Sequence, residues 1–344
     1  MFFQSLNKNL SLIVGFLVVS LVFSSLIFPV EAVQAKVWID LDKDWVYDVG
    51  EPTYDTIQAA IDAASQYDWI GVNATLYNPT GDMVKENVVV NKRGLYIKSV
   101  DGTAIVNASG TNQPVFKIIV ENVIIEGFSV VEGTYGIYVT SANNCNLTKN
   151  KAYNNRFGIF VYDSDNCILI GNHAYNNKYD GIFVEKSVGC VVLNNFIANN
   201  ARHGIWLDNS NQTYIVGNTI ANNKAVDSGI HIDSYSTGNK IHYNNILDNT
   251  DGGSYGVFDE GFPATIATYN WWGDPSGPYP TGQGDAVNEW VEYKPWLNES
   301  ITKAKYTIAL NAGMLDALDE ANITIHYNTT KPVEIYVANY TGNP

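Results

Sequence analysis

Positive charge is scarce in this sequence. Its 344 residues include 20 Lys and Arg against 35 Asp and Glu, a formal net charge of −15 at pH 7. Such an acidic chain is repelled by nucleic acid and by anionic lipid, and its charge favours solubility or cation binding. We therefore expect no nucleic-acid partner. With 46% hydrophobic and only 16% charged residues, the chain can bury one large core.

Cysteine is also scarce, since the chain contains only Cys145, Cys167 and Cys190. In an exported chain an odd number suggests one disulfide and one spare thiol. These three are spaced by 22 and 23 residues, a period that favours small apolar side chains stacked inside one core. A disulfide between neighbouring repeats and a metal site are the two alternatives.

Helical spacing of apolar residues is missing from the centre of the chain. Instead, one unit is written four times between Gly133 and Asn223, with steps of 22, 23 and 23 residues between the opening glycines. The glycines in phase are Gly136, Gly158, Gly181, Gly204, Gly229 and Gly256. Apolar residues alternate with period two inside each unit, which indicates short strands. The sequence therefore predicts an all-β protein, a single-stranded right-handed parallel β-helix.

Alignment of the units assigns side chains to columns along this solenoid. Residues one and three places after each of the first five glycines are aliphatic and are expected to point inward. Two columns consist of asparagine: Asn150, Asn172, Asn195 and Asn218, then Asn155, Asn177, Asn200 and Asn223. Asparagine tolerates left-handed turns, and stacked amides can hydrogen-bond from coil to coil for about 0.5–1.5 kcal/mol each. We expect these columns to form corner ladders.

The first 35 residues have the layout of an export signal, with an apolar run from Leu10 to Val30 after Lys8 and small residues near Ala35. The run is also long enough to remain as a membrane anchor, the one route by which we expect membrane contact. The rest of the chain is expected to be extracytoplasmic, secreted or attached to the cell surface. Eight Asn-x-Ser/Thr sequons follow and are compatible with glycosylation: Asn73, Asn107, Asn146, Asn211, Asn298, Asn322, Asn328 and Asn339.

Residues 36–68 begin with an acidic loop and end with a cap. The loop places carboxylates at positions 1, 3, 5, 9 and 12 of a twelve-residue segment, the calcium pattern of an EF-hand-like loop: Asp40, Asp42, Asp44, Asp48 and Glu51. Trp45 stands where such loops usually have glycine, so a merely solvated acidic loop is the alternative. Asp55–Ala64 is predicted to be a short amphipathic helix with Asp55 as N-cap, lying over the first coil.

Residues 69–297 are expected to form the β-helix, and residues 298–344 a small β-rich appendage or the start of a second module. The solenoid ends in Tyr269-Asn-Trp-Trp-Gly-Asp-Pro-Ser-Gly-Pro278, whose Pro and Gly residues break the strand pattern. We interpret this segment as a C-terminal cap with its tryptophans packed over the last coil. In the appendage, the segments 306–310, 323–327 and 333–337 are predicted strands.

The entry helix, the Asn-Asn…Gly-Ile repeats and the Trp271-Trp272 exit together resemble the pectin-lyase-like superfamily of right-handed β-helix proteins. Within it the chain resembles the NosD-like, carbohydrate-binding and sugar-hydrolase repeat group of archaeal and bacterial surface proteins. The resemblance covers residues 37–297. It implies the β-helix fold, but that group includes lyases, hydrolases, epimerases and adhesins, so it implies no single activity.

Two outward columns are the candidate functional surface. The residues two places after the glycines are mostly aromatic and are expected to make a flat platform on which sugar rings stack: Tyr138, Phe160, Phe183, Trp206 and His231. Two places further on are three acidic residues, Glu185, Asp208 and Asp233. Stacked carboxylates must share protons, stay solvated or hold a cation. Structural packing of both columns is the alternative.

The sequence therefore favours an exported surface β-helix that serves as a binding or structural module, with polysaccharide or surface glycans as partners and calcium as the cofactor. The alternative is a polysaccharide lyase or glycoside hydrolase that uses Glu185, Asp208 and Asp233 as acid/base groups or metal ligands. Arg202 and Lys186 lie near them as conceivable bases. A NosD-like metal-maturation role would need soft ligands, and the cysteines are expected to be buried.

Overall fold

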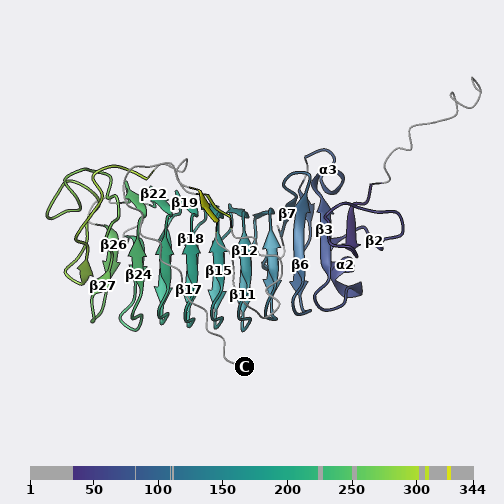
Figure 1. The fold of residues 1–344 in the computed structure, drawn as a ribbon, viewed down its shortest axis with the longest axis horizontal. Helices are drawn as coiled ribbons and strands as arrows, with labels where there is room; N and C mark the ends of the chain where they lie inside the picture. The colour runs from purple at the N-terminus through teal and green to yellow at the C-terminus, as the bar shows by residue number, and fades with distance from the viewer. Residues whose placement is uncertain are drawn as a thin grey trace, which may run out of the picture.

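The computed structural model describes residues 34–81, 83–108, 110, 112–223, 228–249, 254–301, 307–309 and 324–326. These residues form an elongated stack of coils in which three sheets run along the long axis (Figure 1). Between residues 69 and 259 each coil contributes one short strand to each sheet, and neighbouring coils pair in parallel. The predicted all-β parallel β-helix is confirmed.

We name the three sheets A, B and C. Sheet A has twelve strands in the spatial order β2 (Thr53–Tyr54), β1 (Val37–Asp40), β3 (Trp69–Asn73), β6 (Tyr96–Val100), β9 (Ile124–Glu126), β12 (Asn146–Thr148), β15 (Ile168–Ile170), β18 (Val191–Leu193), β21 (Tyr214–Val216), β24 (Lys240–His242), β27 (Thr265–Ile266) and β28 (Val291–Glu292). Only β1 pairs in the antiparallel sense, with β2 and β3.

Sheets B and C have eight strands each. Sheet B contains β4 (Val84–Lys85), β7 (Ile105–Asn107), β10 (Ser129–Val131), β13 (Lys151–Tyr153), β16 (His173–Tyr175), β19 (Phe196–Ala198), β22 (Thr219–Ala221) and β25 (Asn245–Leu247). Sheet C contains β5 (Val88–Val90), β8 (Phe116–Ile118), β11 (Tyr135–Thr140), β14 (Phe157–Tyr162), β17 (Ile182–Glu185), β20 (Ile205–Asp208), β23 (Ser228–Ile232) and β26 (Tyr255–Asp259).

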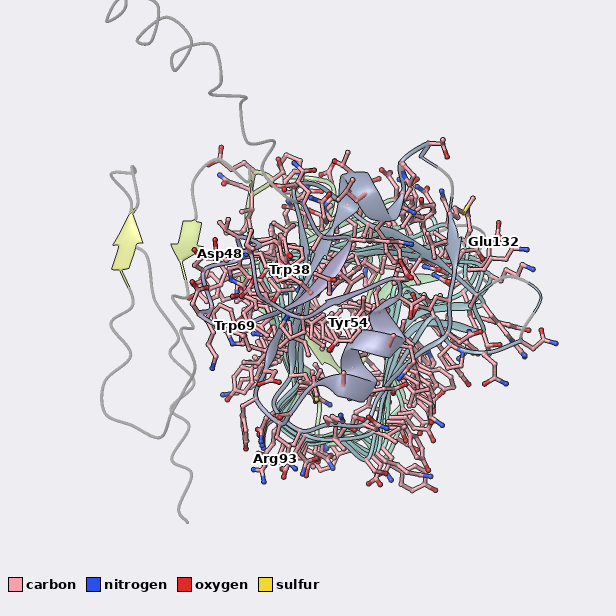
Figure 2. All side chains as sticks on the ribbon, turned by 90° about the vertical axis from the view of Figure 1, so that its right-hand side faces the viewer. Trp38, Asp48, Tyr54, Trp69, Arg93 and Glu132 are labelled. Carbon is pink, nitrogen blue, oxygen red and sulfur yellow. The ribbon has the colours of Figure 1, made fainter. Side chains whose placement is uncertain are left out.

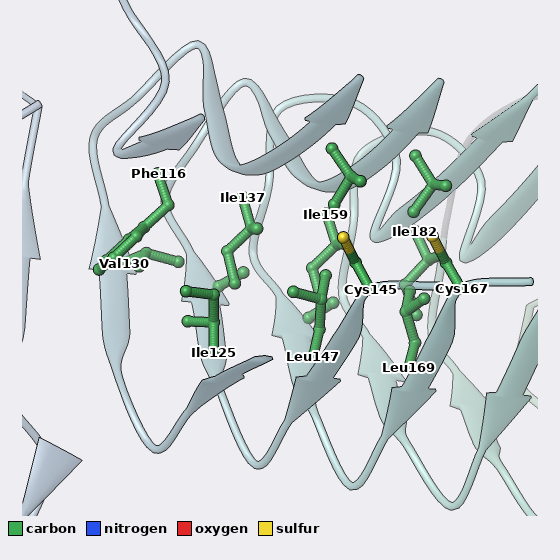
Figure 3. Close-up of a cluster of buried hydrophobic side chains, with 14 of the residues drawn as sticks. Phe116, Ile125, Val130, Ile137, Cys145, Leu147, Ile159, Cys167, Leu169 and Ile182 are labelled. Atoms are coloured by element: carbon green, nitrogen blue, oxygen red, sulfur yellow. The ribbon is translucent and has the colours of Figure 1, made fainter. Parts of the chain in front are cut away.

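The core is a set of aliphatic columns enclosed by the three sheets (Figure 3). Ile137, Ile159 and Ile182 pair directly from coil to coil, as the phase of the glycines predicts. The three cysteines occupy one such column, are fully buried and are free thiols. The packing interpretation of the cysteines is therefore confirmed, and the alternative disulfide is not formed.

The asparagine ladders are buried at two corners of the coil. In the first ladder, Asn172 Nδ2 donates to Asn195 Oδ1 and Asn195 Nδ2 donates to Asn218 Oδ1, each over 3.0 Å. Each amide also donates to a main-chain carbonyl, as Asn195 does to Leu169 O at 2.9 Å. Because the amide carries both donors and an acceptor, every member serves the coils on both sides of it.

The second ladder ends on a carboxylate. Asn249 donates from its backbone N and from Nδ2 to Asp285 Oδ2, at 3.0 and 2.9 Å. A carboxylate suits the last position because it accepts hydrogen bonds from the coil before it. Asp285 belongs to the segment that closes the solenoid, so the ladder and the C-terminal cap are joined at this residue.

The N-terminal end is closed by helix α2 (Ile57–Ala63), which lies in front of the coil in the end-on view (Figure 2). Its N-cap is Thr56, whose side chain accepts from Ala59 N, so the prediction of Asp55 as N-cap was wrong. The Glu86 carboxylate accepts from Gln58 N at 2.7 Å and ties the helix to the coil. A second short helix, α3 (Ala74–Tyr77), follows β3 directly, with Asn73 as its N-cap.

The other end is closed by the segment that carries Trp271 and Trp272. Trp272 is fully buried in the core, as expected of a cap. Beyond it, β29 (Thr307–Ala309) and β30 (Thr324–His326) form an antiparallel pair, in agreement with two of the strands predicted for the appendage. The third, 333–337, lies outside the described residues.

The export segment lies outside the described residues up to position 33, and among the described helices none is long and apolar enough to cross a membrane. The sequons at Asn73 and Asn107 are 6% and 4% exposed. Their side chains are therefore enclosed in the fold, whereas Asn298 is exposed.

Candidate functional site

The outward aromatic column of sheet C is a stack of rings. Strand pairing places Tyr138, Phe160, Phe183 and Trp206 side by side in successive coils. Phe160 and Phe183 lie 4.5 Å apart with planes 7° from parallel, and Phe183 and Trp206 lie 4.2 Å apart at 5°. The ring faces therefore cover one another, and the predicted platform of exposed faces was wrong for the central rings, which are only 6% exposed.

A second aromatic column, which the sequence analysis missed, borders the first. Tyr135, Phe157 and Tyr179 follow one another at 5.4 and 5.0 Å between ring centroids. The Arg156 guanidinium lies 5.0 Å from the Tyr179 ring. We call the two columns together the aromatic wall. Tyr135 and Phe157 stand one place before the glycine of their unit, whereas Tyr179 stands two places before its glycine. An alignment with a fixed period therefore does not show this second column.

The aromatic wall ends in a group of polar residues at β20 and β23. Arg202 lies 3.9 Å over the Trp206 ring and pairs with the buried Asp180 carboxylate at 3.1 Å, so this conceivable base already has a partner. His203 is buried, with its ring 4.5 Å from His231. Burial, together with the nearby His231, lowers the pKa of His203 to about 2. His203 therefore remains neutral at physiological pH.

The acidic column lies beside the aromatic wall. Glu185 and Asp208 are direct partners across β17 and β20, and Asp233 follows in the next coil, where its backbone N donates to Leu207 O. Burial and the charge of Asp208 raise the pKa of Glu185, and burial and Asp233 raise that of Asp208. The structure therefore brings the three predicted carboxylates into one electrostatic group.

The acidic column continues one coil further than predicted, to Glu260. This residue is four places after Gly256, in phase with the other acids, and its Oε1 lies 3.1 Å from His231 Nε2. Extending the period by one coil would have found it, and also Phe258, whose ring follows His231 at 5.5 Å. At the other end, the Lys186 ammonium lies 3.7 Å from Glu185. From here on, the acidic column means Glu185, Asp208, Asp233 and Glu260.

The acidic loop at residues 40–51 forms a separate cluster near the N-terminal end. Ligand oxygens of Asp40, Asp42 and Asp44 lie within 4.8 Å of one another, the one group of three or more metal-ligating side chains found among the described residues. Asp40 is buried and accepts from Lys43 N and Trp45 N, at 2.7 and 2.8 Å. Partial desolvation and the charges of Asp42 and Asp44 raise the pKa of Asp48.

Trp45 occupies the loop position that usually holds glycine. Its backbone is left-handed, with a φ of 67°, the conformation that glycine adopts at this position in such loops. Its ring stacks on Trp69 at 4.4 Å and meets Tyr96 edge-on at 4.6 Å. These contacts offset the strain of a left-handed tryptophan. The Glu51 carboxylate accepts from Leu41 N and Asp48 N at 2.7 and 2.9 Å, so this predicted ligand closes the loop.

Comparison with protein families shows where this chain resembles a known family. Residues 71–261, more than half of the chain, match the family described as periplasmic copper-binding protein (NosD). The chain belongs to the NosD family. The matched residues run from β3 to just beyond β26, so they include the whole aromatic wall and the acidic column.

Among known proteins, a cell surface glycoprotein of Methanothermus fervidus is 37% identical over 102 residues, which are 30% of this chain and 16% of that protein. The matched segment thus spans under a fifth of the relative. A solved structure of the pectate lyase Pel9A superposes with a TM-score of 0.50 at 13% identity, over 81% of this chain and 85% of that one. The periplasmic alginate epimerase AlgG gives a TM-score of 0.47 at 18% identity, over 61% and 51% of the two chains. At such identities the structural likeness concerns the fold alone.

The family description names copper, and the described cysteines and histidines are the side chains that could bind it. Copper favours thiolate, thioether and imidazole ligands. Cys145, Cys167 and Cys190 are fully buried in the core, where Cys190 Sγ faces Ser164 O at 3.4 Å. Among the described residues, the His203 and His231 rings lie 4.5 Å apart, and no group of three or more ligating side chains contains a cysteine or a histidine. Because the acidic loop offers only hard oxygen ligands, the described residues of this NosD-family chain do not fit copper.

Proposed function

We propose that this NosD-family chain is an extracytoplasmic β-helix protein of the cell surface that binds polysaccharide. The observation that carries the proposal is the acidic column of Glu185, Asp208, Asp233 and Glu260 beside the aromatic wall, repeated coil after coil. Carboxylates accept hydrogen bonds from hydroxyl groups, and a surface that repeats along one axis fits an extended polymer. The relative named as a cell surface glycoprotein and the periplasmic family description support the location.

The experiment is a panel of neutral polysaccharides and polyuronates, incubated with the full chain in calcium or in chelator. Retention of the protein on a polymer and the appearance of new chain ends are both scored. We expect retention without new ends. Absence of retention on every polymer would overturn the proposal.

The raised pKa values of Glu185 and Asp208 favour one second candidate, a lyase or hydrolase that acts at the acidic column. A carboxyl group with a raised pKa holds its proton closer to neutral pH, as a general acid must. New chain ends that disappear in Asp208→Asn would select this candidate. Retention that persists in Asp208→Asn without new ends would select the binding module.

We further propose that the acidic loop binds calcium through Asp40, Asp42 and Asp44. Clustered carboxylate oxygens are the ligands that calcium prefers, and the left-handed Trp45 gives the loop its turn. The Trp45 ring connects the loop to Trp69 and Tyr96 on sheet A. Calcium would therefore stabilise the N-terminal end of the solenoid rather than take part in binding at sheet C.

A further inference from the structure

Besides Tyr279, which is 62% exposed, three aromatic side chains near the C-terminal end of the solenoid are exposed, unlike the central rings of the aromatic wall. Phe262 is 79% exposed, Tyr235 74% and Trp290 37%. Exposed aromatic side chains that gather at one place are typical of interaction sites. In the aromatic wall the ring faces are covered by neighbouring rings, whereas these three side chains are open to solvent. A ligand that packs on aromatic rings can therefore reach them.

Tyr235, Phe262 and Trp290 come from different coils, but the segments that carry them contact one another. Tyr235 follows β23 and Phe262 follows β26, in the equivalent turns of adjacent coils. The two turns touch, because a Cβ built on Gly261 would lie 3.0 Å from Ser234 Cα. The Trp290 ring packs edge-on against Phe262, with centroids 6.1 Å apart and planes at 75°. We call Tyr235, Phe262 and Trp290 the aromatic corner.

The aromatic corner adjoins the end of the acidic column. Asp233 and Glu260 lie two places before Tyr235 and Phe262 in the same turns. The Glu260 side chain is 44% exposed, whereas Asp233 Oδ1 accepts from Asn209 N at 2.9 Å and from Ser236 Oγ at 2.6 Å. Any ligand on the rings therefore lies next to fixed negative charge.

This combination selects the chemistry of the ligand. The apolar C–H face of a sugar ring packs on an aromatic ring, and its hydroxyls donate to neighbouring carboxylates. A polyuronate would place its own carboxylates beside Asp233 and Glu260, and like charges at such distances repel. We infer that the aromatic corner is the site that holds polysaccharide and that its ligand is a neutral glycan. This inference rests on the proposed function and assigns its place and substrate class.

The test measures retention of the full chain on neutral glucan, neutral mannan and polygalacturonate, in chelator. We expect the wild-type protein to be retained on at least one neutral polymer and not to be retained on polygalacturonate. Phe262→Ala and Tyr235→Ala are each expected to weaken retention roughly tenfold. The matched control is Tyr67→Ala, which removes a ring 43% exposed next to β3, near the opposite end of the solenoid, and should leave retention unchanged. Thermal unfolding of each variant verifies that it is folded.

The outcomes separate the two claims. Retention of folded Phe262→Ala and Tyr235→Ala at the wild-type level would overturn the assignment of the site and leave the proposed function standing. Stronger retention on polygalacturonate than on either neutral polymer would overturn the ligand class. If the wild type is retained on no polymer, the proposed function fails and this inference fails with it.

Discussion

The asparagine ladders and the acidic column repeat with the same period, but their members interact differently: the amides attract one another through hydrogen bonds, and the carboxylates repel one another. In a ladder, each amide donates to the coils on both sides and accepts from the coil before it, so Asn172, Asn195 and Asn218 are buried with their polar groups paired. The side chains of the acidic column have only acceptors, and burial together with neighbouring carboxylates raises the pKa values of Glu185 and Asp208. The asparagine ladders therefore stabilise the solenoid, because their members hydrogen-bond to one another. The members of the acidic column repel one another and lower the stability of the fold, so the acidic column is the better candidate for a functional surface.

The largest expected effect comes from breaking a ladder. Asn195→Ala would leave Leu169 O and the Asn172 amide groups buried without their partner. Each unsatisfied buried group costs about 1–3 kcal/mol, so we expect a loss of about 3–5 kcal/mol in the free energy of unfolding, measured by urea denaturation.

The control for this variant is Asn199→Gly, next to the other ladder. Asn199 is exposed and has a φ of 56°, a conformation that glycine adopts easily. Its substitution should change the free energy of unfolding by less than about 1 kcal/mol. An equal loss in both variants would mean that the ladder amides add nothing beyond the turn geometry.

The acidic loop extends this comparison to a second group of carboxylates, which lies away from sheet C. Bound calcium would neutralise the charges of this group, whereas the acidic column keeps its charges. A ligand at 100 times its Kd stabilises the folded chain by about 2.7 kcal/mol. We expect a chelator to lower the Tm of the wild type and to have no effect on Asp42→Asn. A chelator effect of the same size in that variant would show that calcium acts elsewhere.

A smaller effect should appear in the pH dependence of Glu185→Gln. The pKa of Glu185 is raised on folding from its ordinary value of 4.5, so the folded chain binds this proton more tightly than the unfolded chain. The carboxylate therefore destabilises the fold above the raised pKa, and the penalty disappears as pH falls towards 4.5. The variant should be more stable than the wild type at pH 7 and equal to it near pH 4. A gap that widens on acidification would contradict this sign.

The sequence predicted the features that follow from the repeat period, namely the register of the strands and the columns of stacked side chains. The phase of the glycines placed Ile159 against Ile182 and Glu185 against Asp208, because a parallel coil keeps its register once its length is constant. It did not predict how Phe160 and Phe183 present their rings, since side-chain torsion and neighbouring coils decide whether faces or edges meet solvent. The left-handed Trp45 was hidden for a similar reason, as its φ is supported by Trp69, a contact from outside the loop.

The exposed rings of the aromatic corner were missed because they belong to turns. Tyr235 and Phe262 lie six places after Gly229 and Gly256, where the earlier coils have no aromatic residue. No column therefore marks them, and only their exposure in the folded chain does so. Periodicity thus identifies the scaffold, while departures from it in the last coils identify the candidate site.

The most direct test of the difference between the two columns is the free energy of unfolding of Asp208→Asn at pH 7, measured in the same urea series as Asn195→Ala. Asp208 lies between Glu185 and Asp233, so removal of its charge relieves repulsion on both sides. We predict a gain of about 0.5–1 kcal/mol, the range for like charges on neighbouring strands, opposite in sign to the loss in Asn195→Ala. A loss in Asp208→Asn would contradict the account, because the acidic column would then stabilise the solenoid as the ladders do.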